Sequence, residues 1–289
     1  MFRVLFLLTI LIPLFPKEIS VSILPQKFIL EQIVKDKFNI NVMVKPGFSP
    51  ATYEPTPSQM KHLSKSDIFF SIGVPFEKNW VPKIEKMIKG LKVVDSSKGI
   101  ERREMDSFKH IEEKNNHHKD HGHKHSHNGK KDPHVWLDPM LVKVIAKNMT
   151  DEMVKADKIN SKFYQKNLEE LNRKMDNINI EIKDLLKGKK SNKFMVFHPS
   201  WGYFGDRYGL KQIPVEVEGK TPSAKQLKEI VKIAKEKKIK ILFVQPQFDK
   251  RALKAIAKEI KGKVLPIDPL SYDYINNLKD VAKKVSESL

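Results

Sequence analysis

The chain contains no cysteine among its 289 residues, and arginine is scarce beside lysine. Without cysteine the sequence supports neither a disulfide framework nor a lipid-anchored N-terminal cysteine. It also lacks a G-x-x-x-x-G-K-[ST] loop, and it has no apolar stretch beyond the N-terminal one that approaches the length of a bilayer span. Any ATP hydrolysis or membrane passage linked to this protein would therefore need other polypeptides.

The charge of the chain comes mainly from lysine. Net charge is +19, yet only six of the 54 basic residues are arginine, the residue that makes bidentate contacts in sequence-specific nucleic-acid readers. The lysines are mixed with acidic residues in helical stretches such as 225–240. We therefore expect a solvated, lysine-rich surface and no nucleic-acid partner.

Residues 1–16 have the pattern of an export signal. Arg3 provides a positive start, and an apolar run of about twelve residues follows it, which suits a signal peptide better than a membrane span. A buried N-terminal strand is disfavoured because Ile19 to Leu24 already predicts a strand. No A-x-A-like pair of small residues precedes Lys17 to mark the cleavage site. We expect a signal peptide over 1–16 and a periplasmic protein without a lipid anchor.

Strand and helix signals alternate along the rest of the chain. Strands are predicted at 19–24, 42–44, 67–72, 91–95, 194–197, 213–217, 239–244 and 264–267. Helices are predicted at 28–34, 56–63, from 138 onward, 221–237 and 249–261. Short β-branched runs separated by helices are typical of parallel βαβ units, so the fold class is predicted to be α/β.

The strongest helical period runs from Asn160 to Lys187. Its apolar residues recur at spacings of three and four, at Leu168, Leu171, Met175, Ile178, Ile182 and Leu185. Such a helix would be about 40 Å long, and its stripe is too short to favour a coiled-coil dimer. We expect an N-terminal α/β lobe over 17–158, a rigid connecting helix over 159–187 and a C-terminal α/β lobe over 188–289.

Histidine is crowded into one polar segment. Six histidines fall at His117, His118, His121, His123, His125 and His127. Between 109 and 131 hydrophobic residues almost vanish, which predicts a mobile, His-rich loop. Imidazole is a common ligand of zinc and related metals. The loop is interpreted as a low-affinity zinc scavenger or sensor; the alternative is an insertion with incidental metal affinity.

Three further candidate ligands share one position in the predicted topology. His198 and Asp268 each follow a strand, and His134 stands at a turn before a helix. Ligands of open α/β sheets bind beyond the carboxyl ends of strands, so these side chains could converge on a cleft. Two imidazoles and a carboxylate suit Zn²⁺ and tolerate Mn²⁺ or Fe²⁺. Taken singly, His198 could bond to backbone, His134 could belong to the loop, and Asp268 could cap a helix.

Several strings together resemble one protein family. They are VKPGFSPATYEPTP (44–57), DPHVWLDP (132–139), FHPSWGYF (197–204), EVEG (216–219), VQPQF (244–248) and IDPL (267–270). In this order they resemble the zinc and manganese group of metal-binding substrate-binding proteins of ABC importers. Within that group they resemble the zinc type. The resemblance implies two α/β lobes joined by one long helix, with the metal between them. It also implies His134, His198 and Asp268 as the metal ligands.

One position departs from the family pattern. The family usually places a histidine where this chain has Ala51, and a methyl group cannot bind a metal. Water, Glu54 or a histidine of the 109–131 loop could complete the coordination, with His62 as a further candidate. Water or a loop histidine is favoured because prolines fix the direction of Glu54. By resemblance, His198 favours zinc, since manganese-selective members tend to carry a carboxylate there.

The leading hypothesis is a monomeric carrier, not an enzyme, that captures Zn²⁺ and delivers it to an ABC permease with its ATPase. The membrane would be reached only through that permease. An alternative is the same role for Mn²⁺ or Fe²⁺, and another is a zinc buffer without a transporter. A zinc hydrolase is the remaining alternative, since three protein ligands leave an open position, but the chain has no H-E-x-x-H motif.

Overall fold

The computed structural model describes residues 17–108, 130–217 and 219–289. The predicted signal peptide and nearly all of the predicted His-rich loop, including its six histidines, lie outside these residues. In the described part of the chain, no helix is both long enough and apolar enough to cross a membrane.

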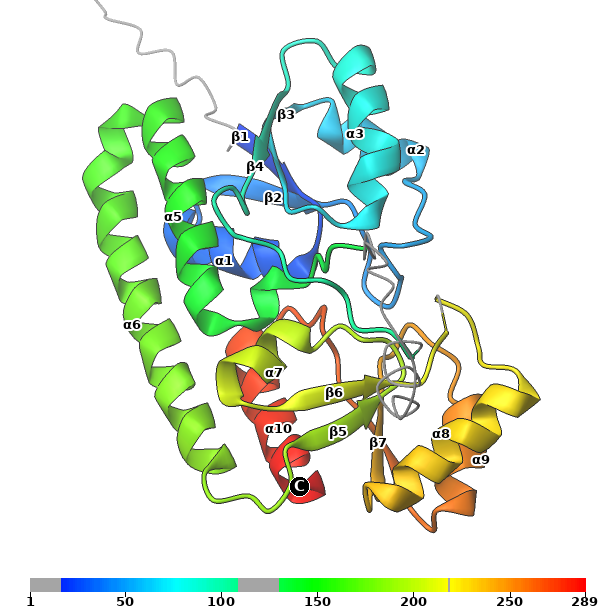
Figure 1. Cartoon of the computed structure of the whole chain (residues 1–289). Helices are drawn as coiled ribbons and strands as arrows, with labels where there is room; N and C mark the ends of the chain where they lie inside the picture. The colour runs from blue at the N-terminus through cyan, green and yellow to red at the C-terminus, as the bar shows by residue number, and fades with distance from the viewer. Residues whose placement is uncertain (1–16, 109–129, 218) are drawn as a thin grey trace, which may run out of the picture.

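The N-terminal lobe is built on a parallel four-stranded sheet (Figure 1). Its strands are β1 (Lys17–Val21), β2 (Phe38–Val42), β3 (Ser66–Ser71) and β4 (Lys92–Asp95), in the order β2-β1-β3-β4. Its helices are α1 (Leu24–Val34), α2 (Pro57–Leu63), α3 (Pro75–Met87) and α5 (Pro139–Ala156). Figure 1 shows α1 and α5 on one side of the sheet and α2 and α3 on the other.

The C-terminal lobe repeats this plan. Its strands are β5 (Lys193–Val196), β6 (Lys211–Pro214), β7 (Ile241–Val244) and β8 (Lys263–Pro266), all parallel and in the order β6-β5-β7-β8. Its helices are α7 (Gly202–Tyr208), α8 (Ala224–Glu236), α9 (Arg251–Glu259) and α10 (Tyr274–Ser288). The two sheets thus have equivalent strand orders, a repeat that is not visible in the sequence.

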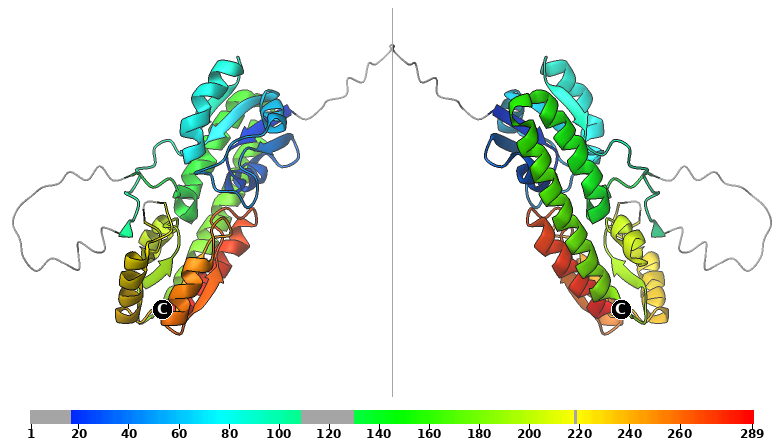
Figure 2. Two further views of the ribbon diagram at one scale, coloured as in Figure 1. Left: turned by 90° about the vertical axis from the view of Figure 1, so that its right-hand side faces the viewer. Right: turned by 90° about the vertical axis from the view of Figure 1, so that its left-hand side faces the viewer.

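One long helix, α6 (Ser161–Leu186), runs along both lobes (Figure 2). Short 3₁₀ turns, η1 (Val135–Leu137) and η2 (Lys158–Asn160), precede α5 and α6. Helix α6 contacts α1 and α5 of the N-terminal lobe and α10 of the C-terminal lobe. The predicted α/β fold of two parallel-sheet lobes joined by one long helix is confirmed. The predicted lobe boundaries stay a prediction.

Several element boundaries differ from the prediction. The second strand is Phe38–Val42, earlier than predicted, and α8 begins at Ala224 instead of Thr221. Ser223 is the N-cap of α8: its Oγ accepts a bond from the Gln226 backbone N–H while the Gln226 side chain accepts from the Ser223 N–H. The helix therefore begins at this capping box, three residues later than predicted. Helices α3, α7 and α10 were not predicted.

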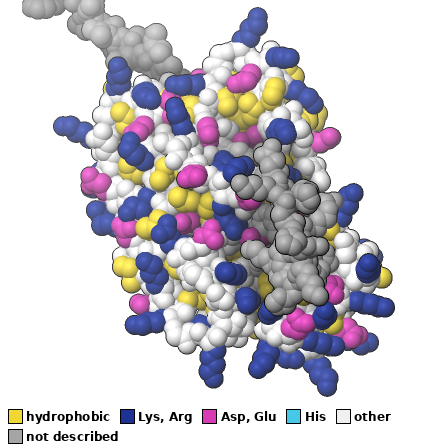
Figure 3. All heavy atoms as spheres, in the orientation of Figure 1, with side chains coloured by type: hydrophobic (Ala, Val, Ile, Leu, Met, Phe, Trp, Pro, Cys, Tyr) yellow, Lys and Arg dark blue, Asp and Glu magenta, His cyan; other side chains and the backbone are white. Residues whose placement is uncertain are grey.

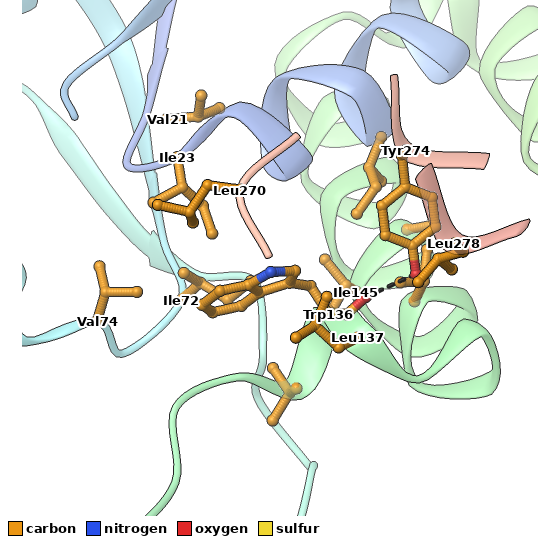
Figure 4. Packing of buried hydrophobic residues seen from close by; sticks show 14 of the residues in the cluster. Val21, Ile23, Ile72, Val74, Trp136, Leu137, Ile145, Leu270, Tyr274 and Leu278 are labelled. Atoms are coloured by element: carbon orange, nitrogen blue, oxygen red, sulfur yellow. Dashed lines mark hydrogen bonds between the residues drawn. The ribbon is translucent and has the colours of Figure 1, made fainter. Parts of the chain in front are cut away.

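The two lobes share buried apolar contacts around Trp136, as Figure 4 shows. The Trp136 indole N–H donates to the carbonyl oxygen of Pro269 at 2.7 Å, and the Tyr274 hydroxyl donates to the Trp136 carbonyl at 2.6 Å. Leu270 and Leu278 pack in the same cluster as Ile72 and Val74. The segment around Trp136 is therefore fixed between the lobes. His134 stands two residues before Trp136.

Candidate metal centre

A cavity of about 500 Å³ lies between the lobes. Residues of the N-terminal lobe that line it include Ala51, Val74 and His134, and those of the C-terminal lobe include His198 and Glu216. Most of the remaining lining is apolar, with Phe108, Trp136, Phe248 and Leu270 among the contributors. The two histidines predicted as ligands thus reach one cavity from opposite sides.

His134 is held in place by its own chain segment. It precedes the 3₁₀ turn η1 and is only 8% exposed. Its Nδ1 lies 2.7 Å from Asp132 Oδ1, and its backbone N–H donates to the same oxygen at 3.0 Å. The ring meets the Trp136 ring edge to face, with 5.2 Å between the centroids. Because Asp132 engages Nδ1, Nε2 is the nitrogen left for a metal.

The electrostatics of this pair favour a neutral ligand. Burial lowers the pKa of the His134 imidazole, and the attraction of Asp132 opposes this only in part. Burial alone would raise the pKa of Asp132, but the charge and hydrogen bonds of His134, with the charge of Arg103, outweigh it and hold that pKa below its ordinary value. A neutral imidazole beside an ionised carboxylate is the state in which histidine binds a metal.

His198 lies two residues beyond the end of β5 at Val196. Its backbone is held by the buried Gln245 side chain, which accepts from the His198 N–H at 3.2 Å and donates to the His198 carbonyl at 2.6 Å. Its ring stacks on Phe248 at 5.2 Å between centroids. Glu216 Oε1 lies 2.9 Å from Nδ1, although the two groups are not aligned as a hydrogen bond. The Nδ1 edge of the ring therefore faces a carboxylate instead of backbone.

The two imidazoles lie close together. Their ring centroids are 5.3 Å apart and the ring planes are inclined by 72°. Each ring has a buried carboxylate at Nδ1, Asp132 for His134 and Glu216 for His198. Carboxylates in this position orient metal-binding histidines and make them better donors. Two such rings at one cavity are suited to hold a divalent transition metal.

Asp268 lies beside this cavity but is not among its lining residues. Its Oδ1 accepts from the Leu270 N–H at 2.9 Å and from the Gln247 side-chain amide at 3.3 Å, and both of these partners line the cavity. Asp268 does not cap a helix, because α10 begins at Tyr274 with Asp273 as its N-cap. Across residues 17–108, 130–217 and 219–289, no group of three or more His, Cys, Asp or Glu side chains is assembled to hold a metal. The role of Asp268 as third ligand stays a prediction.

The structure distinguishes among the candidates for the ligand that would replace the missing histidine. Ala51 lines the cavity, whereas Glu54 is exposed and does not line it. His62 has a 53% exposed side chain and lies 3.8 Å from Glu18, on α2 and away from the cavity. The six loop histidines are outside the described residues. The cavity lining includes Phe108 and Lys130, the residues on either side of the undescribed segment.

Sequence reasoning missed the two carboxylates behind the imidazoles. Asp132 and Glu216 were part of the family-like strings, but no role was assigned to them. The spacing of Asp132 and His134, two residues apart across a proline, was the available signal. Nothing in the sequence pairs Glu216 with His198, which lie on different strand ends. Arg103, whose guanidinium lies 3.2 Å from Asp132 Oδ2, was missed for the same reason.

The chain was compared with known proteins. The family described as zinc-uptake complex component A, periplasmic, matches residues 19–288. The high-affinity zinc uptake system protein ZnuA of Bacillus subtilis (strain 168) is 31% identical over 258 residues, 88% of this chain and 76% of that protein. The manganese ABC transporter substrate-binding lipoprotein PsaA of Streptococcus mitis is 28% identical over 238 residues, 80% of this chain and 72% of that protein. A crystal structure of a ZnuA deletion mutant with zinc bound matches with a TM-score of 0.84 and 36% identity, covering 95% of this chain and 98% of that chain.

These matches confirm the predicted family resemblance and the two-lobed fold. Members of the matched family are substrate-binding components of transporters, so the prediction that the chain is not an enzyme is also confirmed. The zinc hydrolase alternative finds no support. The chain belongs to the family of periplasmic zinc-uptake components, the metal-binding substrate-binding proteins of ABC importers.

Proposed function

We propose that this protein captures Zn²⁺ in the cavity between its lobes and delivers it to a membrane permease driven by a separate ATPase. The observation that carries the proposal is the pair of imidazoles, 5.3 Å apart at their centroids, each with a buried carboxylate at Nδ1. The family match to a zinc-uptake component supports the same reading.

In this proposal Nε2 of His134 and Nε2 of His198 bind the ion, and Asp268 supplies a carboxylate. The position of Asp268 is compatible with this role, since its hydrogen-bond partners Gln247 and Leu270 line the cavity. A fourth ligand is needed where Ala51 offers none. Water or a histidine of the 109–131 segment fits this role better than Glu54 or His62, because neither of those side chains lines the cavity.

Zinc is favoured over Mn²⁺ and Fe²⁺ as the cargo. Manganese prefers oxygen ligands, whereas two imidazoles suit zinc. One relative is named for manganese and another for zinc, so family membership alone leaves both cargoes in view. Competitive titration with equal concentrations of Zn²⁺, Mn²⁺ and Fe²⁺ tests the assignment, and a preference for Mn²⁺ would overturn it.

The proposed place of action is the periplasm. The segment 1–16 would direct export as a signal peptide and then be cleaved, and the protein would carry no lipid anchor. The absence of cysteine from the printed sequence supports the last point. We further propose that the protein acts as a monomer and meets the membrane only through its permease. Fractionation of the host cell and light scattering of the purified protein test these statements.

The decisive experiment is zinc titration of His134→Ala and His198→Ala against a competing chelator. Each substitution removes a proposed ligand and should weaken tight binding tenfold or more. His62→Ala is the matched control, since His62 is exposed and outside the cavity. If either ligand variant binds zinc as tightly as the control, the proposed site is wrong.

A further inference from the structure

Arg103 lies at the centre of a cluster of three carboxylates next to the metal centre. Its Nη1 is 3.1 Å from Asp106 Oδ2 and 3.2 Å from Asp132 Oδ2, and its Nε is 2.8 Å from Asp206 Oδ2. Asp206 belongs to α7 of the C-terminal lobe, whereas Asp132 precedes η1 on the other side. One guanidinium therefore joins carboxylates from both lobes.

The first branch of this cluster leads to His134. Asp132 is fully buried and uses its two oxygens separately. Oδ2 faces Arg103, while Oδ1 accepts from the backbone N–H of His134 and lies 2.7 Å from its Nδ1. The orientation of Asp132, and through it of the imidazole, thus depends on where the guanidinium lies.

The second branch leads to the loop that carries His198. Asp106 Oδ2, which faces Arg103, also accepts from the side-chain amide of Gln212 at 2.9 Å. The same amide donates to the Pro199 carbonyl at 3.1 Å, and its oxygen accepts from the Trp201 N–H at 2.9 Å. The buried Gln212 therefore connects Asp106 to the backbone directly after His198.

The molecule leaves room for this arrangement at Gly202. A β-carbon at that position would lie 1.7 Å from Arg103 Nη1 and 2.9 Å from Asp132 Oδ2. Gly202 is the first residue of α7 and has no positive φ, so its backbone would accept alanine. The position is thus restricted by the guanidinium and not by its own backbone. The neighbouring Tyr203 hydroxyl links Arg103 and Asp132 a second time. It accepts from the backbone N–H of Arg103 and donates to the Asp132 carbonyl.

We propose that Arg103 is a positioning residue for zinc capture. It sets the placement of His134 through Asp132, and that of His198 through Asp106 and Gln212. A planar guanidinium with several donors in a fixed fork can bind three carboxylates at defined angles, which an ammonium cannot. Metal affinity depends on ligands held close to their binding geometry by such supporting groups. This inference rests on the proposed function, since it assumes zinc between these two imidazoles.

The test compares variants of the full-length protein by zinc titration against a competing chelator chosen to suppress weak sites. Arg103→Met removes the fork, Arg103→Lys keeps only the charge, and Gly202→Ala displaces the guanidinium while removing no polar group. Arg102→Met is the matched control. Its guanidinium donates to the Ile72 carbonyl and to Ser97 Oγ at 2.7 Å each, and in the described part of the chain it forms no ion pair with Asp106, Asp132 or Asp206.

We expect Arg103→Met and Gly202→Ala to weaken zinc binding about tenfold, at the lower end of the cost of losing an outer-sphere partner. Arg103→Lys should recover only part of the loss, and Arg102→Met should stay within about twofold of the parent protein. A merely structural role would lower the melting temperature without changing the visible spectrum of the Co²⁺-loaded protein. Positioning predicts that the spectrum changes in Arg103→Met and Gly202→Ala, because the ligand geometry changes.

The proposal is overturned if Gly202→Ala and Arg103→Lys bind zinc like the control and give the parent Co²⁺ spectrum. Should Arg103→Met fail to fold, these two variants still decide the question. His134→Ala and His198→Ala, measured in the same series, keep the two claims apart. If they also bind zinc normally, the site itself is misplaced; if they lose it while Gly202→Ala and Arg103→Lys do not, only the role of Arg103 is wrong.

Discussion

At the scale of single residues, two carboxylates stand behind the imidazoles of the candidate metal centre. Asp132 and Glu216 are each 6% exposed or less, and each lies within 3 Å of an imidazole Nδ1. One oxygen of Glu216 is buried without a hydrogen-bond partner among the described residues. A buried anion without full compensation is costly unless a nearby positive charge offsets it. A divalent cation bound to His198 would supply that positive charge.

We therefore predict that Asp132→Asn and Glu216→Gln each weaken zinc binding by about tenfold to a hundredfold. The amides keep the size of the side chains but lose the negative charge that orients and polarises the imidazole. Chelator competition measures the effect, with the surface variant Asp151→Asn as the control. Zinc affinities equal to that of the control would show that these carboxylates do not support the ligands.

Glu77 is another buried carboxyl group, close to the cavity wall at Val74. It accepts hydrogen bonds from the Ser22 hydroxyl and from the backbone N–H groups of Ile72 and Gly73. Burial raises its pKa to about 7, although these hydrogen bonds oppose the shift, and the negative charge of Asp95 raises the pKa further. The folded protein therefore keeps a proton on Glu77 at pH values where the unfolded chain has lost it.

This shift predicts how stability varies with pH. Because the pKa is raised in the folded state, the contribution of Glu77 is present in full below about pH 4.5 and is lost as pH rises toward 7. Over that window the loss should be on the order of 3 kcal/mol. Urea unfolding of the chelator-treated protein at pH 5 and pH 7.5 should show it, and Glu77→Gln should remove it.

The control for that measurement is Glu85→Gln, on the exposed side of the same helix. If Glu85→Gln and Glu77→Gln have equal pH profiles, burial of Glu77 does not govern the stability of the protein in this range.

At the scale of elements, α6 joins the two lobes through one buried stripe. Leu171, Met175, Ile178 and Ile182 were predicted to be apolar contacts and are buried. The end of the stripe was wrong: Leu185 is 41% exposed, and Leu186 is buried instead. Spacings of three and four from Ile182 are equally helical, so only the packing partner decides between them. Here α10 lies against this end of α6, where the Ser286 hydroxyl donates to the Leu185 carbonyl.

Truncation of Met175 should destabilise the whole protein. Its side chain is fully buried, and we expect Met175→Ala to lower the free energy of unfolding by about 2–5 kcal/mol. Ile180→Ala, on the exposed side of the same helix, should change it by less than about 1 kcal/mol. Urea denaturation measures the free energy of unfolding of both variants. Equal losses would mean that the buried face of α6 does not stabilise the protein.

At the scale of the whole molecule, one buried cluster joins the two equivalent sheets, and a second, smaller cluster lies between the C-terminal sheet and helices α8 and α9. The largest buried cluster includes residues of β1, β3, α6 and α10. The hydrogen bonds of Trp136 with Pro269 and Tyr274 cross between the lobes close to His134. Lysine and arginine side chains are spread over the face in Figure 3, with acidic residues among them. This surface agrees with the solvated, lysine-rich exterior expected from the composition.

The segment 109–129 is flanked by Phe108 and Lys130, which line the cavity. Its flanks pair as an antiparallel stem, with a bridge between Glu104 and Lys131 and a bond from the Met105 N–H to the Lys130 carbonyl at 2.9 Å. We predict that replacing 109–129 by a short Gly-Ser linker lowers zinc stoichiometry while sparing most of the tight binding. Isothermal titration checks both quantities. Loss of the tight site in this variant would instead identify a loop histidine as the fourth ligand.

Local patterns were sufficient for most of the fold. The long helix, the cap at Thr56 and most strand positions follow from periodicity and capping signals that act within a few residues. Two of the candidate ligands, His134 and His198, were found because they stand at the ends of elements. Helix α3 was missed because a proline stands inside it, at Pro82. Such a residue usually signals an end to helical structure.

The sequence by itself determined the alternation of strands and helices, the family, and the candidate imidazole ligands, because each of these depends on neighbours along the chain. The tertiary structure alone decided that Glu216 faces His198, that Arg103 lies against Gly202, and that Leu186 replaces Leu185 in the core. Those contacts join residues from different elements, and their energies depend on the packing of whole elements, which no local pattern of residue types records.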